Sequence, residues 1–372
     1  MSDVNRHVVK IESLSSQGAG IARLGDLVVF VDQTVPEETV EIEIIEHKKN
    51  FARGKVVRII APGVSRITAP CPVAEECGGC QWQHIEYAEQ LRQKSRIVRD
   101  ALQRIGGVVL PGPVEIEPSP REFRYRNRIQ VHVQNQKIGY FAAKSHDLIA
   151  IEDCLIAEEA LVKEFPAVIK SAPQDRNSYR YEIKMSQDEG VSFQNRDLGF
   201  SQVNRYQIAN LVNYVVQLSA RYQVKTIYDF FCGSGNFAFP LREKFPEAVV
   251  TGIDLNEPAI IHANQIASHD AKMKFVLADC ENYLRREKIP NKSLVILDPP
   301  RIGCSEEFMH ELSGKHQGPI IYVSCNPATL SRDVKNLMRV RSGWRVLSVR
   351  AFDMFPQTAH VETVVLVDAD GA

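Results

Sequence analysis

The second half of the chain most constrains its fold, because from about residue 201 short apolar strands alternate with segments of helix length. The strand sequences are TIYDFF, AVVTGID, KFVLAD, SLVILD and PIIYVSC. Such alternation is typical of a parallel sheet that is covered by helices on both faces. In sheets of this kind ligands bind outside the carboxyl ends of the strands. We therefore predict a doubly wound α/β domain over residues 200–372, with its binding site at that edge.

Aspartates mark the ends of the first four of these strands. They are Asp229, Asp254, Asp279 and Asp298. The first strand leads into the turn FCGSGNF at residues 231–237, where two glycines would let the backbone pass close beneath a ligand. This turn also satisfies the loose G-x-G-x-x-A pattern, so NAD and S-adenosylmethionine are both compatible with it. The aspartate four residues before the first glycine and the segment DPPR at residues 298–301 favour S-adenosylmethionine.

The same residues define a predicted site for S-adenosylmethionine. Asp254 would contact the ribose hydroxyls and Asp279 the adenine amino group, while Asn236 and Phe231 would line the methionine side. The predicted set in this part of the chain consists of Phe231, Gly233, Gly235, Asn236, Asp254, Asp279 and Asp298. A single acid of this kind can be a turn or helix-capping residue, but four at successive strand ends favour a shared ligand.

A cysteine follows the fifth strand, in the segment SCNPATL, which places Cys325 at the same edge. A thiolate is useful there if the methyl acceptor is an unreactive carbon, such as C5 of a pyrimidine, which becomes nucleophilic after addition at C6. The C5 proton must afterwards be removed by a base, and the segment FPQTAHVE supplies Glu362. The nearby His360 is more commonly a structural residue. We predict Cys325 and Glu362 as the catalytic pair.

Four segments, DFFCGSGNF, LDPPR, SCNPATLSRD and FPQTAHVE, resemble the RNA uracil-5 methyltransferases, which make 5-methyluridine in ribosomal and transfer RNA. The resemblance runs through nearly the whole chain and implies a Rossmann-like methyltransferase fold. It also implies that Cys325 attacks C6 and that Glu362 removes the C5 proton. The segment FSQVN at residues 200–204 matches the family pattern F-x-Q-x-N, which implies that Gln202 contacts the methyl donor. The family often has glutamate where this chain has Asp254.

The first half of the chain has a different organisation. Residues 6–58 contain short β-rich runs broken by turns, which predicts a small barrel over residues 1–60. Its segment SQGAGIAR resembles a TRAM domain, an OB-like barrel that binds RNA. Residues 87–105 have the apolar spacing of an amphipathic helix. Strand-like runs then return up to about residue 200, with a helix near residues 157–171, so we predict an α+β domain over residues 61–199.

Four of the eight cysteines form a separate group. Cys71, Cys77 and Cys80 have the spacing C-x5-C-x2-C, and Cys154 lies far downstream. Four thiolates can hold zinc or an iron–sulfur cluster, and the spacing leaves both open. The resemblance implies a 4Fe-4S cluster, because the ribosomal branch of the family holds one with cysteines in this order.

The first residues lack a basic start followed by an apolar run, so we expect a cytoplasmic protein.

The segment REFRYRNR at residues 121–128 alternates arginine with aromatic and amide side chains. Aromatic rings stack on unpaired bases and arginines bind phosphates. The predicted RNA-binding residues are Arg124, Tyr125, Arg126 and Arg128. Because the net charge of the chain is −1, attraction to RNA must be local. The barrel and the cluster together point, through the resemblance, to 23S ribosomal RNA, with uridine 54 of transfer RNA as the alternative.

Other functions remain open at this stage. An amino-group methyltransferase would also use the segment DPP, but such enzymes usually have an aromatic residue where this chain has Arg301. A non-catalytic RNA-binding protein with a methyltransferase fold and a nicotinamide-dependent oxidoreductase are the two alternatives from other classes. We expect a monomer. We also expect no association with membranes, because no run of 18 uncharged apolar residues occurs.

Overall fold

The computed structural model describes residues 5–175, 177–186, 190–195 and 203–369. The chain divides into two compact units, which we describe separately. Unit 1 comprises Met1–Lys94, Ser119–Tyr206 and Met354–His360, and unit 2 comprises Ser95–Pro118, Gln207–Asp353 and Val361–Ala372. None of the helices in the described ranges combines the length and the apolar character that crossing a lipid bilayer requires. The division into three domains with boundaries near residues 60 and 200 remains a prediction.

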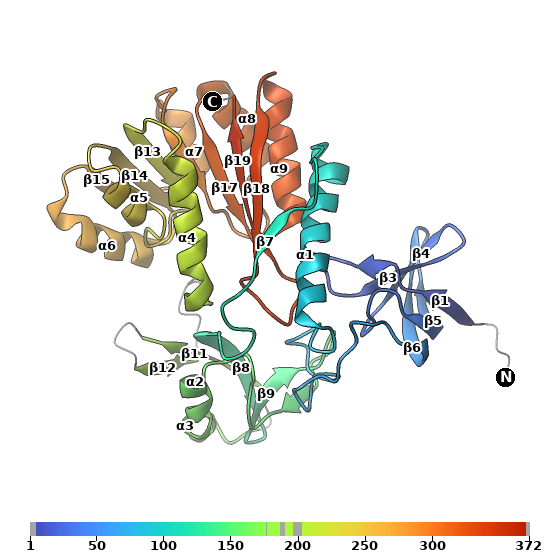
Figure 1. Ribbon diagram of the computed structural model, residues 1–372. Helices are drawn as coiled ribbons and strands as arrows, with labels where there is room; N and C mark the ends of the chain where they lie inside the picture. Colours follow the sequence, from blue (N-terminus) through green and yellow to red (C-terminus); the bar gives the residue numbers. More distant parts are fainter. Residues whose placement is uncertain (1–4, 176, 187–189, 196–202, 370–372) are drawn as a thin grey trace. The chain divides into compact units, whose positions relative to one another are not determined.

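The N-terminal part of unit 1 is a six-stranded sheet with the order β1-β5-β6-β4-β3-β2 (Figure 1). The strands are β1 (Arg6–Lys10), β2 (Ser13–Leu14), β3 (Gly20–Leu24), β4 (Leu27–Val31), β5 (Thr39–His47) and β6 (Phe51–Ala61). Alternate side chains of these strands point inward, as in Val40 and Ile42 of β5, and form one apolar core. The predicted N-terminal β module is thereby confirmed.

The second part of unit 1 is a five-stranded antiparallel sheet with the order β10-β9-β8-β11-β12. Its strands are β8 (Arg128–Gln134), β9 (Lys137–Phe141), β10 (Leu148–Ala150), β11 (Tyr179–Met185) and β12 (Val191–Gln194). The single helix expected near residues 157–171 is instead two short helices, α2 (Glu159–Lys163) and α3 (Phe165–Ser171). Pro166 lies in the first turn of α3, where its missing N–H is harmless, and it prevents α2 from continuing.

Unit 2 contains an eight-stranded sheet with the order β15-β14-β13-β16-β17-β19-β18-β7 (Figure 1). Its strands are β7 (Glu115–Glu117), β13 (Thr226–Phe230), β14 (Val249–Asp254), β15 (Met273–Leu277), β16 (Leu294–Leu297), β17 (Ile320–Ser324), β18 (Arg345–Phe352) and β19 (Glu362–Asp368). Neighbouring strands are parallel except at β19, which runs antiparallel to both β17 and β18. The predicted doubly wound sheet is confirmed, with one reversed strand that the alternating pattern did not reveal.

Helices connect and cover these strands. They are α1 (Tyr87–Ala101), α4 (Arg205–Ser219), α5 (Ala238–Lys244), α6 (Glu257–Ile266), α7 (Cys280–Arg286), α8 (Glu306–Lys315) and α9 (Pro327–Val340), with a π-helical turn at Leu102–Gly106 and a 3₁₀ turn at Ala267–His269. The helix predicted over residues 87–105 is therefore present. It ends at Gly107, whose φ of 70° suits the left-handed position that closes a helix.

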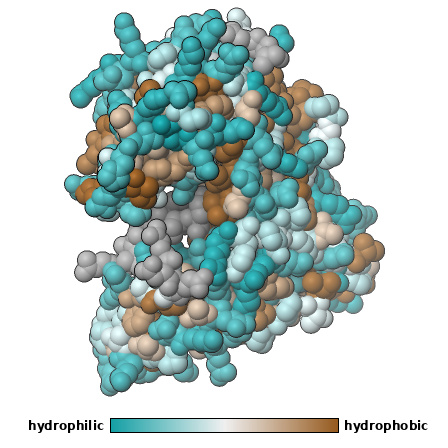
Figure 2. All heavy atoms as spheres, turned by 60° about the vertical axis from the view of Figure 1, so that its left-hand side comes forward, coloured by the Kyte–Doolittle hydropathy of each residue, from teal (hydrophilic) through white to brown (hydrophobic). Residues whose placement is uncertain are grey.

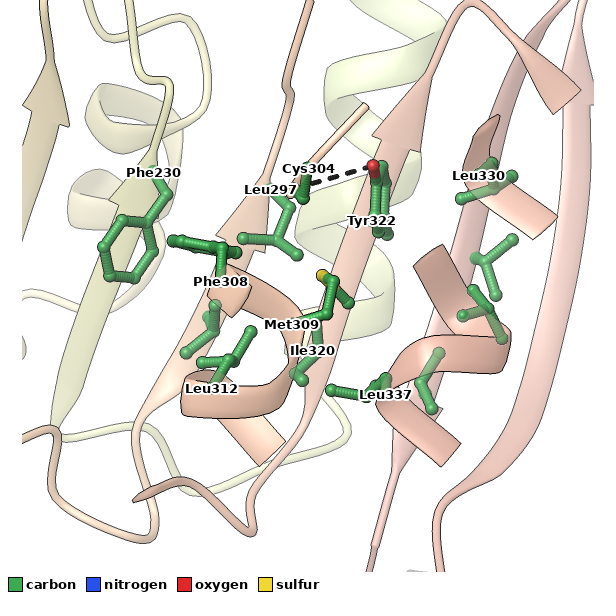
Figure 3. Packing of buried hydrophobic residues seen from close by; sticks show 14 of the residues in the cluster. Phe230, Leu297, Cys304, Phe308, Met309, Leu312, Ile320, Tyr322, Leu330 and Leu337 are labelled. Carbon is green, nitrogen blue, oxygen red and sulfur yellow. Dashed lines mark hydrogen bonds between the residues drawn. The ribbon is translucent and has the colours of Figure 1, made fainter. Parts of the chain in front are cut away.

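The core of unit 2 lies between the sheet and helices such as α8 and α9 (Figure 3). Strands β16 and β17 are buried along their whole length, as expected of central parallel strands with helices on both faces. The rings of Phe230 and Phe308 meet edge to face with centroids 5.3 Å apart. On the face shown in Figure 2, hydrophilic side chains predominate and hydrophobic ones are scattered among them.

Candidate active site

The turn after β13 has a backbone that few side chains tolerate. Phe231, Gly233 and Gly235 have φ values of 63°, 52° and 91°. A Cβ atom on Gly235 would lie 2.7 Å from the ring of Phe239, so glycine is required there on two grounds. Asn236 is exposed at the tip of this turn. The turn therefore presents backbone atoms and one amide side chain at the carboxyl edge of the sheet, where the sequence predicts a binding site.

Three of the four predicted acids influence one another at this edge. Burial, followed by the charge of Asp298, raises the pKa of Asp229 well above its usual range. Burial and the charge of Asp254 raise the pKa of Asp298. Asp254 accepts a hydrogen bond from the backbone N–H of Gly233 at 2.8 Å, which ties the end of β14 to the glycine turn. Burial and mutual repulsion thus favour the neutral forms of Asp229 and Asp298 beside the turn.

The fourth acid, Asp279, has a structural task as well as a predicted one. Its Oδ1 atom accepts a hydrogen bond from the backbone N–H of Asn282 at 2.8 Å and so caps α7.

Two large apolar side chains at neighbouring strand ends are exposed: Leu255, which follows β14, is 65% exposed, and Leu277, which ends β15, is 49% exposed. Sequence reasoning did not select these leucines, although each lies within two residues of a selected acid.

Cys325 and Glu362 lie opposite each other. Strand β17 ends at Ser324, which pairs with Thr363 of antiparallel β19. In an antiparallel pair the next residue on one strand faces the preceding residue on the other, so Cys325 faces Glu362. The side chain of Arg301, from the segment DPPR, lies near enough to both groups for its charge to favour their ionised forms. The structure thus brings together a thiol, a carboxyl and a guanidinium group.

The electrostatics of this group set its protonation. Burial, followed by the charge of Glu362, raises the pKa of the Cys325 thiol to about 11, while Arg301 acts in the opposite direction. Burial, followed by the charge of Asp298, raises the pKa of Glu362 well above its usual range. The side chain of Glu362 is buried. The thiol is therefore protonated at neutral pH, and the carboxyl is suited to take up a proton.

The loop that carries Arg301 is held by helix α9. The backbone carbonyl of Arg301 accepts hydrogen bonds from Asn326 Nδ2 at 3.1 Å and from Thr329 Oγ1 at 3.2 Å. Further along the loop, Asp333 accepts a hydrogen bond from the backbone N–H of Cys304 at 2.8 Å and one from the Tyr322 hydroxyl at 2.6 Å. Figure 3 shows Cys304 beside Tyr322 at this point. Helix α9 and its N-cap residue therefore anchor the loop of Arg301.

The four predicted cysteine ligands line one cavity in unit 1. They are Cys71, Cys77, Cys80 and Cys154, and all four are partly exposed, free thiols. Burial raises the pKa of Cys80 to about 12, and the charge of Cys154 acts in the same direction. Burial, followed by smaller contributions that include the charge of Cys154, also raises the pKa of both Cys71 and Cys77. The fold thus joins residues that are more than 70 positions apart in the chain.

Polar groups surround this cavity. The hydroxyl of Tyr140 donates a hydrogen bond to Cys154 Sγ at 3.5 Å, and Gln83 Oε1 accepts one from the backbone N–H of Cys71 at 3.1 Å. Arg126 also lines the cavity. Across the described ranges of the chain, no three cysteine, histidine or acidic side chains converge closely enough to hold a single metal ion. A four-iron cluster is larger, because each thiolate binds a different iron atom.

The predicted RNA-binding segment has a different role in the structure. Tyr125 is fully buried and its hydroxyl donates to the carbonyl of Pro356 at 3.0 Å, so its ring is not accessible for stacking on a base. Arg124 forms two hydrogen bonds with Asp153, at 2.8 and 2.6 Å. Arg128 pairs with the buried Glu182. Arg124 and Arg128 are thus engaged in ion pairs within unit 1 and Tyr125 is buried, which the charge pattern alone did not indicate.

A partly exposed group of two aromatic rings and one arginine, which also pairs with Glu46 at 3.3 Å, lies on the N-terminal sheet. The rings of Phe30 and Phe51 meet edge to face at 5.7 Å, and the guanidinium group of Arg53 lies 6.0 Å from each. Phe30 and Arg53 are paired across β4 and β6, so they share one face. Both rings are partly exposed. We call Phe30, Phe51 and Arg53 the barrel patch.

The remaining predicted donor contact, Gln202, lies outside the described residues.

Comparison with known proteins agrees with this architecture. Residues 175–370 match the family model described as tRNA (Uracil-5-)-methyltransferase, and residues 7–57 match the TRAM domain. A protein of Bdellovibrio bacteriovorus named as an uncharacterized RNA methyltransferase is 38% identical, over 97% of this chain and 95% of its own length. One of Aquifex aeolicus with the same description is 30% identical, over 96% of this chain and 97% of its own length.

A solved structure has a similar fold. It is the Pyrococcus abyssi tRNA (uracil-54, C5)-methyltransferase in complex with S-adenosyl-L-homocysteine, with a TM-score of 0.72 and 24% identity. The match covers 97% of this chain and 100% of the archaeal one. The TRAM-like module, the central α+β part and the Rossmann-like sheet therefore recur together in that protein.

Proposed function

Because this chain belongs to the tRNA (uracil-5-)-methyltransferase family and is therefore an RNA methyltransferase, we propose that it transfers a methyl group to C5 of a uridine in RNA. The placement of Cys325 opposite Glu362, beside Arg301, carries this proposal. An amino-group methyltransferase would have no use for a thiol at this position, since an amino nitrogen is already nucleophilic. A nicotinamide-dependent oxidoreductase would likewise leave the thiol and the carboxyl without a task.

The proposed reaction uses the chain's own side chains in two steps. Cys325 loses its proton to solvent and the thiolate adds to C6, and the electron pair of the former C5–C6 double bond makes C5 nucleophilic and forms the bond to the methyl group. Glu362 then accepts the C5 proton, the C5–C6 double bond re-forms and the bond between sulfur and C6 breaks, so the thiolate is regenerated. Arg301 opposes the raised pKa of the thiol and so favours the thiolate that both steps require.

S-adenosylmethionine would supply the methyl group. The residues proposed to bind it in the described part of the chain are Phe231, Gly233, Gly235, Asn236, Asp254, Asp279 and Asp298. The glycine turn leaves open space beside the backbone of Gly233, and the exposed Leu255 and Leu277 offer apolar surface for an adenine ring. Gln202 is a further proposed contact on the evidence of the sequence alone.

We propose that the four cysteines hold a 4Fe-4S cluster. Four thiols around one cavity suit this group, and the guanidinium of Arg126 and the hydroxyl of Tyr140 suit the negative charge that four thiolates would bring. Cys71, Cys77, Cys80 and Cys154 would be its ligands. Anaerobically purified protein should contain about four iron and four sulfide per chain. The Cys154→Ala variant should contain neither, whereas stoichiometric zinc in colourless wild-type protein would contradict the proposal.

The proposed RNA substrate is 23S ribosomal RNA, supported by the four cysteines through the resemblance to the ribosomal branch. Uridine 54 of transfer RNA is the second candidate. The architecture does not separate them, because an archaeal protein with the same fold along its whole length is named for transfer RNA. Incubation with labelled methyl donor and both unmodified RNAs tests the proposal. Label in 23S RNA as 5-methyluridine is expected, and label in transfer RNA alone would overturn the assignment.

A further inference from the structure

The connection between β18 and β19 has an unusual set of contacts. Its central part, Met354–His360, belongs to unit 1, whereas β18 and β19 belong to unit 2. Four successive backbone carbonyls of this segment, from Met354 to Gln357, each accept a hydrogen bond from a different residue. The donors are Asn204 Nδ2 at 3.2 Å, Lys94 Nζ at 3.0 Å, the Tyr125 hydroxyl at 3.0 Å and the Trp82 backbone N–H at 3.0 Å.

A glutamine pair adds to this arrangement. Gln90 Nε2 donates to Gln357 Oε1 at 2.9 Å, and the backbone N–H of Gln357 donates to Gln90 Oε1 at 2.9 Å. Gln90 Nε2 also lies within hydrogen-bonding distance of the carbonyls of Trp82 and Ile85. Gln357 has a φ of 68°, a left-handed conformation that is strained for a non-glycine residue and persists only when its surroundings enforce it.

The residues that hold the segment are all buried. Gln90, Lys94, Tyr125 and Asn204 are 0% exposed. A buried lysine is costly unless it is paired, and Lys94 combines its hydrogen bond with a position 5.7 Å from the ring centre of Trp82. Apolar side chains could fill the same space at lower cost. The hydrogen bonds of these polar groups therefore select one backbone conformation of the segment, which apolar packing alone would not do.

The segment leads directly to the proposed base. Its chain continues through Val361 into Glu362, the first residue of β19, which pairs with Phe352 at the end of β18. We propose that Gln90, Lys94 and Tyr125 are positioning residues for Glu362: they fix the Met354–His360 segment and thereby orient the carboxyl that removes the C5 proton. This inference rests on the proposed function.

The step that these residues should affect is the release of product. In it the bond between C5 and its hydrogen breaks and the proton passes to the Glu362 carboxylate. The electron pair forms the C5–C6 double bond, and the bond between Cys325 sulfur and C6 breaks. A loosened segment leaves Cys325 and the donor site intact, because neither is part of it. The covalent complex between enzyme and methylated RNA should then accumulate.

Two conservative substitutions test the inference. Tyr125→Phe removes one hydroxyl, and Lys94→Met removes the ammonium group while keeping the length of the side chain. Each should lower kcat at least about fivefold, since each removes at least one hydrogen bond to the segment, and raise the fraction of RNA in the covalent complex by a similar factor. KM for S-adenosylmethionine should not change. Lys94→Arg keeps a charged donor and should restore part of kcat.

The matched control is Tyr214→Phe, which removes a hydroxyl that hydrogen-bonds Ser348 at 2.8 Å and does not contact the segment. It should leave both kcat and the covalent fraction as in the wild type. A purely structural role would lower complex formation and product release together, without accumulation of the complex, and that result would overturn the inference. If wild-type enzyme methylates RNA and Cys325→Ser does so equally well, the proposed function itself fails, which is a distinct outcome.

Discussion

At the scale of single residues, the reaction that we propose depends on the protonation of Cys325 and Glu362. The pKa of Cys325 is raised to about 11 by burial and by the charge of Glu362, so the thiolate is the minor form at neutral pH. Below its pKa the thiolate fraction rises about tenfold per pH unit, and covalent complex formation should rise with it. In the Glu362→Gln variant, the carboxylate charge that helps to raise the pKa of Cys325 is absent. Complex formation in this variant should therefore shift to lower pH, and the complex should persist because the base is missing.

The measurement is the amount of denaturation-resistant RNA–protein complex between pH 6 and pH 10 for both proteins. Glu306→Gln is the control, since Glu306 is exposed in the first turn of α8. It should follow the wild-type profile. Normal turnover by Glu362→Gln would show that another group is the base.

At the scale of elements, helix α9 organises the site through one buried carboxylate. Asp333 accepts hydrogen bonds from the Cys304 backbone and the Tyr322 hydroxyl, and it also pairs with Arg332. Asp333→Ala would leave these buried donors without their acceptor, which should lower the free energy of unfolding by about 3 kcal/mol. The loop of Arg301 should also shift, so covalent complex formation should fall. Urea unfolding and complex formation measure the two effects.

Lys335→Ala is the matched control on the same helix, because Lys335 is exposed. It should change the free energy of unfolding by less than about 0.5 kcal/mol. Equal stability of Asp333→Ala and Lys335→Ala would contradict the role that we assign to the carboxylate.

At the scale of the whole molecule, we expect RNA binding and methyl transfer to depend on different parts of the chain. The barrel patch combines two partly exposed rings with a guanidinium group, a set suited to unpaired bases and phosphates. We expect Phe51→Ala combined with Arg53→Ala to weaken RNA binding about tenfold, since one stacked base contributes about 1–3 kcal/mol. The affinity for S-adenosylmethionine should be unchanged. Filter binding at several salt concentrations should also show a slope reduced by about one.

Lys10→Ala provides the comparison, since Lys10 is a basic residue of the same sheet that pairs with Glu37 outside the patch. Its RNA affinity should stay close to that of the wild type. If the two variants weaken binding equally, the N-terminal sheet binds RNA by general charge and not through the barrel patch.

The sequence by itself determined the elements and the edge of the sheet at which chemistry takes place. Apolar runs of strand length, spaced by helices, dictate a parallel sheet, and residues at strand ends such as Asp298 and Cys325 must meet at one edge. Local pattern is sufficient here because it depends on residues that are close in the chain. The break at Pro166 and the reversed strand β19 are the places where the pattern was incomplete.

Only the tertiary structure decided which distant residues share an environment. It buried Tyr125, which the charge pattern had placed on the surface, and it joined Gln90 to Gln357, 267 positions away. It also brought Cys154 to the other three cysteines. The physical reason is that a buried polar group must find a hydrogen-bond partner wherever the fold supplies one, and this requirement carries no signature in the neighbouring sequence.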